Sequence, residues 1–99
     1  MNLSSRQRKH LRALAHHLDP VVKIGKQGLT PQLIKAIDVA LEDHELIKVK
    51  FIDHKDEKSE YVPEIVKQTN AEIAGIIGNI VILFRIAKDE EKRNIKLPK

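Results

Sequence analysis

Four consecutive residues, Gly25-Lys26-Gln27-Gly28, have the types and spacing of a loop that grips phosphate groups. Glycine has no Cβ atom, so the backbone can come close to a ligand, and Lys26 adds a mobile positive charge. The helix expected after the loop would point unpaired N–H groups and its positive dipole end in the same direction. The alternative is a tight turn that leads into a helix. The spacing excludes the usual mononucleotide and dinucleotide loops, which need glycines or a Lys-Ser/Thr pair at other positions.

Positive charge is concentrated in the segment that ends at this loop. Residues 1–28 contain six lysine and arginine side chains and one acidic side chain, whereas residues 29–99 contain twelve basic and thirteen acidic side chains. The formal net charge of the chain is +4. This distribution favours a polyanionic partner, and the alternative is a basic surface that only keeps the domain soluble.

A basic helix is expected to precede the loop. It begins at a serine cap, Ser4 or Ser5, and it stops at Asp19-Pro20 because the residue before a proline is pushed out of the α region. Its buried stripe should be formed by Leu11, Leu14, Ala15 and Leu18. The opposite arc carries the cations Arg6, Lys9 and Arg12 together with His10, His16 and His17.

The remaining pattern predicts helices that alternate with strands. Thr30 and Pro31 are strong start signals for the second helix, and Gly78-Asn79 is suited to the tight turn of a hairpin. Pro63 is acceptable in the third helix only if it lies within the first turn. The expected elements are a strand at 21–24, a helix from 31 to about 43, a strand at 46–52, a helix from about 61 or 62 to 69, and a hairpin within 71–87.

These elements form one compact α/β domain over residues 1–87, with the order α-β-α-β-α-β-β and a mixed sheet. Residues 88–99 are expected to be a polar C-terminal tail that frays. In the strand at 46–52, Ile47, Val49 and Phe51 should face the core. Lys48 and Lys50 on its other face are interpreted as a solvent face, and the alternative is that they extend the basic patch.

No residue cluster has the pattern of a catalytic or metal site, so we expect a protein that is not an enzyme and has no cofactor. The histidines lack carboxylates at ligand spacing, and His44 and His54 fall at a helix end and in a loop, where histidine is ordinary. No serine lies in a nucleophile elbow. The chain has no cysteine and no segment that could be a signal peptide or span a bilayer, so we expect a soluble cytoplasmic protein.

A second tetrad with the same glycine spacing, Gly75-Ile76-Ile77-Gly78, has apolar centres in a strand context, so we assign it to strand packing and the hairpin turn. The chain has only three aromatic residues, of which Phe51 and Phe84 are expected in the core. Recognition by base stacking is therefore not expected, and backbone contacts and shape should dominate.

The ordered segments LDPVVKIGKQGLTPQLIKAIDVALEDHELIKVKF and IIGNIVILFR, after a basic first helix, resemble the stand-alone bacterial YhbY-like proteins of the CRM domain family (chloroplast RNA splicing and ribosome maturation). The resemblance runs from about residue 3 to residue 85. It implies a four-stranded mixed sheet similar to the C-terminal domain of the third bacterial translation initiation factor. It also implies an RNA-binding protein that is associated with precursors of the large ribosomal subunit.

By matching position, the resemblance gives the RNA-binding role to the loop residues Gly25, Lys26, Gln27 and Gly28. Auxiliary phosphate contacts are expected from Arg6, Lys9, Arg12 and Lys23. The expected partner is ribosomal RNA or a large-subunit precursor particle, bound by a monomer without a membrane. The alternative is a protein-binding module whose cationic helix meets an acidic ribosomal protein or assembly factor.

Overall fold

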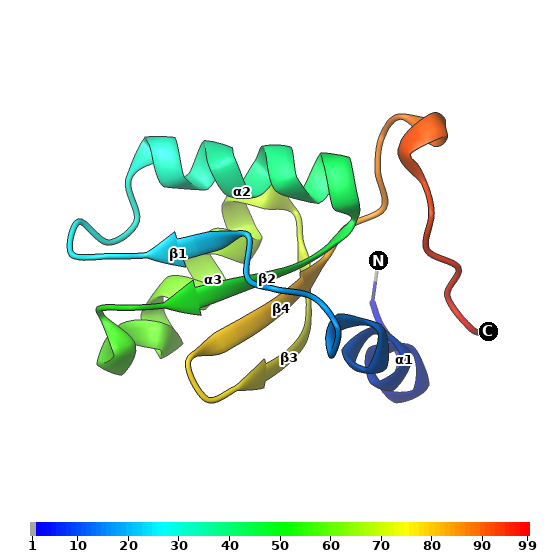
Figure 1. The fold of residues 1–99 in the computed structure, drawn as a ribbon, viewed down its shortest axis with the longest axis horizontal. Coiled ribbons are helices and arrows are strands. Elements are labelled where there is room, and N and C mark those ends of the chain that lie inside the picture. The colour runs from blue at the N-terminus through cyan, green and yellow to red at the C-terminus, as the bar shows by residue number, and fades with distance from the viewer. Residues whose placement is uncertain (1) are drawn as a thin grey trace.

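The computed structural model describes residues 2–99, which form a three-layer α/β domain (Figure 1). Its radius of gyration is 12.7 Å and its longest extent is 38 Å. The expected order of helices and strands is confirmed. The elements are α1 (Ser5–Ala15), β1 (Val22–Ile24), α2 (Pro31–His44), β2 (Leu46–Phe51), the 3₁₀ turn η1 (Lys55–Glu57), α3 (Lys58–Thr69), β3 (Glu72–Ile77), β4 (Ile80–Phe84) and the 3₁₀ turn η2 (Glu90–Lys92).

The four strands form one mixed sheet in the order β1-β2-β4-β3. The pair β1 and β2 is parallel, and the other two pairs are antiparallel. Because β1 and β2 are parallel, the chain between them must cross over the sheet, and α2 makes this crossover. The hairpin between β3 and β4 turns at Gly78 and Asn79 as expected, with Gly78 in the left-handed region at φ 57°.

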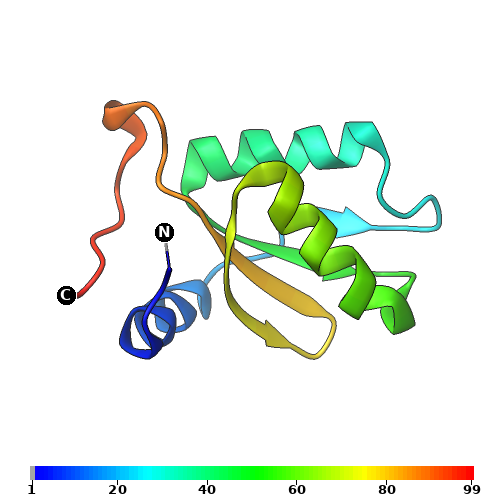
Figure 2. The ribbon, with the colours of Figure 1, turned by 180° about the vertical axis from the view of Figure 1, so that it is seen from behind.

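The sheet has a core on each face. Helices α2 and α3 cover one face (Figures 1 and 2), where Ile37, Leu41 and Ile65 pack against Val49 and Phe51. Helix α1 covers part of the other face through a smaller core. This core contains Leu3, Leu11, Ala15, Leu46, Ala74, Ile82 and Phe84. The expected burial of Phe51 and Phe84 is confirmed, since both are fully buried.

The helix caps agree with the local sequence signals. Ser4 caps α1 and forms a reciprocal capping box with Gln7, and the Thr30 hydroxyl accepts a hydrogen bond of 3.1 Å from the Leu33 N–H. Asn70 ends α3 in the left-handed conformation. These caps set where each helix begins or ends, and the cap at Thr30 fixes the direction in which the chain leaves the glycine loop.

Two expectations about the helices are wrong. Helix α1 ends at Ala15, and Leu14 and Leu18 are 41% and 39% exposed, because only the Leu11 and Ala15 side of the helix contacts the sheet. Helix α3 begins at Lys58, so Pro63 lies inside the helix and beyond its first turn. Pro63 is exposed, so water can bond the carbonyl group that loses its intrahelical partner.

The tail after Ala87 does not fray as expected, because two carboxylates near the end of α2 hold its backbone. Glu45 is 1% exposed, and it accepts hydrogen bonds from the N–H groups of Ala87, Asn94 and Ile95 at 2.8, 2.8 and 3.2 Å. Glu42 accepts from the N–H groups of residues 88 and 89. In addition, Ile95 and Leu97 pack against the smaller core. The charged composition of the tail does not predict these contacts.

Candidate functional site

The loop of residues 25–28 joins β1 to α2 at one end of the long axis of the molecule (Figure 1). The Gly28 N–H donates a hydrogen bond of 3.0 Å to the Gly25 carbonyl, so the four residues close a tight turn. Lys26 and Gln27 at the tip of this turn are exposed. The N-terminus of α2 follows after the Thr30 cap, so its positive dipole end lies close to the turn.

The two glycines of the loop are under different constraints. Gly28 is buried with φ 68°, and a Cβ atom added there would lie 3.1 Å from the Tyr61 Oη. Gly25 has no positive φ, and an added Cβ atom would meet no atom within 4 Å. The fold therefore requires glycine at position 28 but not at position 25, where the open side of the backbone is available to a ligand.

His54 and Tyr61 support the loop from behind. The His54 imidazole Nε2 donates to the Lys26 carbonyl at 2.7 Å, and the Tyr61 Oη lies 3.3 Å from the His54 Nδ1. The hydrogen bond to Lys26 is the main reason why the pKa of His54 is raised above its ordinary value. The nearby carboxylates of Asp53 and Glu57 raise this pKa further, while partial burial opposes them.

The sequence places His54 in a loop, as the structure does, but does not predict its contact with Lys26. His54 is 28 residues from its partner Lys26 and takes the left-handed conformation at φ 55°. No local pattern indicates such a contact. The only available signal is indirect: the parallel pairing of β1 and β2 brings the residues that follow both strands to the same edge of the sheet.

Lysines extend from the loop across the sheet face that α1 leaves open. Lys23 of β1 pairs in register with Lys50 of β2, and Lys48 pairs with Ile82, which belongs to the smaller core beneath α1. Residues 23, 48 and 50 therefore lie on the α1 side of the sheet. Lys23, Lys26 and Lys50 are exposed and have no ion-pair partner among the described residues. Lys48 donates a hydrogen bond of 2.9 Å to the Leu18 carbonyl.

The basic residues expected on α1 have different surroundings. The side chains of Arg6 and Lys9 are exposed and, within residues 2–99, have no hydrogen-bond or ion-pair partner. Arg12 lies across Gly75 of β3, and its guanidinium donates to the Ala74 carbonyl at 3.0 Å, so it also docks the helix. Helix α1 and the loop are at opposite ends of the molecule (Figure 1), so the fold does not bring these expected contacts into one pocket.

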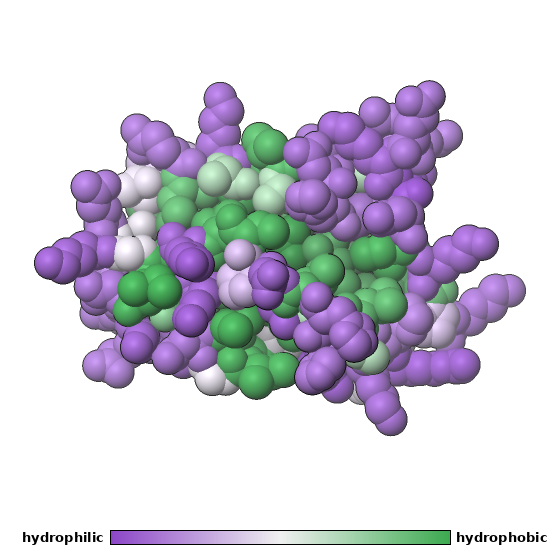
Figure 3. All heavy atoms as spheres, viewed as in Figure 1, coloured by the Kyte–Doolittle hydropathy of each residue, from purple (hydrophilic) through white to green (hydrophobic). Residues whose placement is uncertain are grey.

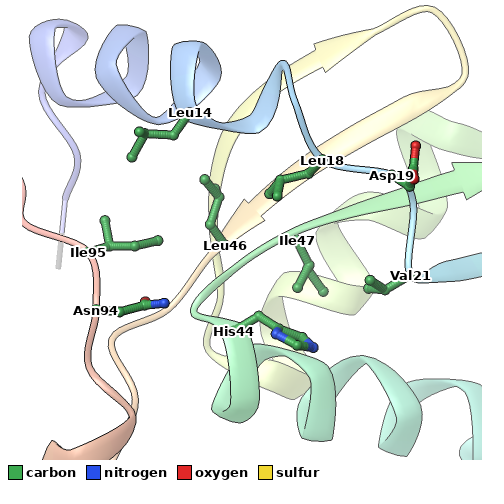
Figure 4. A pocket seen from close by; sticks show the side chains of 9 residues that line it. All are labelled: Leu14, Leu18, Asp19, Val21, His44, Leu46, Ile47, Asn94 and Ile95. Atoms are coloured by element: carbon green, nitrogen blue, oxygen red, sulfur yellow. The ribbon is translucent and has the colours of Figure 1, made fainter.

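An apolar groove opens between α1, β2 and the C-terminal segment (Figure 4). Its volume is about 520 Å³. The lining includes the exposed side chains of Leu14, Leu18 and Val21, with Ile95 on the opposite side and His44, Asp19 and Asn94 at its polar positions. Figure 3 shows a continuous hydrophobic surface in the middle of this face. The groove can accept an apolar side chain or a flat ring.

The described residues contain no group of three or more histidine, cysteine or acidic side chains that could hold a metal ion. None of the helices within residues 2–99 is long and apolar enough to cross a membrane.

Comparisons with known proteins agree on one family. Residues 3–85 match the CRS1 / YhbY (CRM) domain. The chain is 41% identical to the "RNA-binding protein" of Haemophilus influenzae, with coverage of 98% of this chain and 96% of that protein. It is 36% identical to "Probable RNA-binding protein YqeI" of Bacillus subtilis, over 97% of this chain and 99% of that protein.

The fold of the chain is also similar to a solved structure. The solution structure of the SAV1595 protein of Staphylococcus aureus superimposes with a TM-score of 0.79 and 36% sequence identity. The similarity covers 98% of this chain and all of that one. The α/β arrangement and the mixed four-stranded sheet are therefore shared over nearly the whole length.

Proposed function

Because this chain belongs to the CRS1 / YhbY (CRM) domain family, we propose that it is a non-enzymatic RNA-binding protein that binds ribosomal RNA or large-subunit precursor particles during ribosome assembly. The relatives named as RNA-binding proteins support the class of ligand. The place in large-subunit assembly rests on the resemblance to the YhbY-like members of the family. RNA would be gripped by the loop of residues 25–28.

One observation carries the proposal: the loop leaves its ligand-binding groups free. The Cβ side of Gly25 is open, and the Lys26 ammonium group is exposed without an ion-pair partner in the described part of the chain. A lysine held only for stability would be expected to contact a carboxylate or a carbonyl group. A free cation beside an accessible backbone is suited to a phosphate of a polyanion.

We propose that the basic surface continues beyond the loop. Lys23 and Lys50 would contact the next phosphates along the open face of the sheet, and Arg6 and Lys9 would contact phosphates at the far end of the molecule. Arg12 would contribute through the guanidinium N–H groups that do not bind the Ala74 carbonyl. These contacts position the RNA backbone and carry little information about the base sequence.

The test is Lys26→Glu, measured as the affinity for a large-subunit rRNA precursor across a salt series, with duplex DNA and an unrelated RNA as competitors. Binding should weaken for every RNA. The slope of log Kd against log salt should fall by about 1, as expected when one phosphate contact is lost. Lys67→Glu, the same charge change on α3 behind the sheet, is the matched control and should keep the affinity within about twofold. Equal affinity of the Lys26 variant and the control would contradict the role of the loop.

A second function, docking on a ribosomal protein or assembly factor, is favoured by the apolar groove. The side chains of Leu14, Leu18 and Val21 form an exposed apolar surface. A protein that binds RNA only through phosphates does not need such a surface, whereas a protein-docking site does. Leu18→Asp should abolish binding to such a partner and leave binding to free rRNA intact. If Leu18→Asp lost binding to free rRNA but kept binding to the ribosomal protein or assembly factor, the groove would be excluded as a protein-docking site.

A further inference from the structure

The hydrogen bond between His54 and the loop fixes the position of one imidazole proton. The Lys26 carbonyl oxygen can only accept, so the His54 Nε2 at 2.7 Å must carry a proton in both the neutral and the charged imidazole. Titration of His54 therefore occurs at Nδ1. The loop keeps its support at every pH, and the hydrogen bond becomes charge-assisted when the ring is protonated.

The surroundings of Nδ1 suit both states. The Tyr61 Oη at 3.3 Å can donate to a neutral ring, and the Glu57 carboxylate at 3.5 Å attracts a protonated one. The other charged groups near His54 are Asp53, whose carboxylate accepts a hydrogen bond from the backbone N–H of His54, and the exposed side chains of Lys55 and Asp56 in the same turn. With its side chain only 26% exposed, the ring lies directly behind the loop backbone.

We infer that His54 is a positioning residue of the loop, which fixes the Lys26 carbonyl and places a titratable positive charge behind the phosphate site, so that RNA binding takes up a proton. The inference rests on the proposed RNA-binding function. A phosphate held at the loop would stabilise the imidazolium, and by linkage the imidazolium would strengthen the grip on the phosphate. Tyr61 would assist by filling the space beneath Gly28.

His54→Gln and His54→Ala separate the two parts of this role. The glutamine amide can donate to the Lys26 carbonyl but does not titrate, whereas alanine loses both the hydrogen bond and the charge. The affinity of each protein for the large-subunit rRNA precursor would be measured from pH 6 to pH 8.5. His44→Gln, which removes a histidine at the far end of α2, is the matched control.

The wild-type protein should gain about fivefold more affinity than His54→Gln between high and low pH, because a fivefold linkage equals a pKa rise of about 0.7 unit. NMR titration of the His54 ring should show the same rise when RNA is added. The His44 control should keep the wild-type profile, and His54→Ala should bind more weakly at every pH. Histidines on α1 contribute equally to all of these proteins, so the difference between profiles reports His54.

Identical pH profiles of the wild type and His54→Gln would overturn the proton linkage. Positioning of the loop has its own readout without RNA: the Gly28 amide should exchange with solvent faster in His54→Ala than in His54→Gln. Equal exchange rates in the two variants would overturn the positioning role. Failure of the wild type to bind RNA at any pH would instead defeat the proposed function, so the two failures are distinguishable.

Discussion

At the N-terminal end of α2, the ammonium groups of Lys23 and Lys26 have no partner among the described residues, whereas at its C-terminal end the carboxylates of Glu42 and Glu45 accept five hydrogen bonds from backbone N–H groups of the following chain. Asp38 and Asp43 on the same helix pair with Arg85 and Lys92. The cations near the N-terminal end of α2 are therefore unpaired, whereas the carboxylates near its C-terminal end bind groups of the same chain.

This difference separates charges that stabilise the fold from charges that are available to a ligand. Sequence composition cannot make the distinction, because the acidic residues of α2 and the lysines near the loop are all ordinary surface residue types. In the structure, each group can be assigned by asking whether a partner within the chain already satisfies it. The assignment predicts that substitutions at the two ends of α2 act on different quantities, namely stability and affinity.

The largest loss of stability is expected from Glu45→Ala. Three backbone N–H groups would lose a buried carboxylate acceptor, and the expected cost is about 3 kcal/mol in the free energy of unfolding. Urea unfolding followed by circular dichroism measures this change. Glu45→Gln keeps one oxygen acceptor, so its free energy of unfolding should fall by less. This variant should remain folded even if Glu45→Ala does not fold. The RNA affinity of the folded glutamine variant should be unchanged. A loss of affinity would show that the two ends of α2 do not act separately on stability and affinity.

Gly28→Ala should cost about 1 to 2 kcal/mol, because alanine is strained at φ 68° and its Cβ atom would crowd the Tyr61 Oη at 3.1 Å. Thermal unfolding measures the loss. Adding Tyr61→Phe to the Gly28→Ala variant removes the oxygen that crowds the new Cβ atom, so the double variant should recover part of the lost stability. If Gly28→Ala were as stable as the wild type, the loop would not have the supported conformation seen here.

Much of the fold could be predicted because its signals are local. The Ser4 and Thr30 caps, the Gly78-Asn79 turn and the alternation of β2 all depend on residues close together in the sequence. The failures occurred where distant contacts override composition. Glu45 binds N–H groups up to 50 residues away, and this contact orders a tail whose charge indicated fraying.

The spacing of the glycines predicts a ligand-binding loop at residues 25–28, and this role stays a prediction, whereas no sequence pattern predicts the side chains that support the loop from behind. Nothing in the sequence around His54 or Tyr61 relates them to Lys26, because their proximity depends on strand pairing. For Lys50, the sequence leaves open whether it extends the basic patch, and only its register with Lys23 places the two lysines side by side. Sequence patterns identify residues that could bind a ligand, whereas the fold determines which of them share a surface.

The pH dependence of stability should also differ between the two ends. Hydrogen bonds from the N–H groups of residues 89 and 88 hold the pKa of Glu42 below 4.5. Its contribution to stability is therefore present above pH 4.5 and is lost as the pH falls through the lowered pKa. The raised pKa of His54 has the opposite sign, so its contribution is present below pH 6.5 and is lost as the pH rises through the raised value.

Thermal unfolding of Glu42→Gln and His54→Gln across the pH range tests this pair of signs. The difference in Tm between the wild type and Glu42→Gln should shrink as the medium becomes acidic. The difference for His54→Gln should shrink as it becomes alkaline. Both effects are expected to be small, since both side chains are still partly accessible to water, which screens their interactions. If the Tm of each variant differed from that of the wild type by the same amount at every pH, neither group would be linked to folding.

The smallest change in stability, and the sharpest test of the comparison, is expected from Gly25→Ala. The added methyl group meets no atom within 4 Å and the backbone is not in the left-handed region, so the free energy of unfolding should stay within about 0.5 kcal/mol of the wild type or rise slightly. The same methyl group would stand where an RNA backbone must approach the loop, so affinity for the rRNA precursor should fall while thermal stability does not. Unchanged affinity would show that RNA does not approach the open side of Gly25. The loop would then be only a turn into α2, and the free lysines at that end would be a solvated surface.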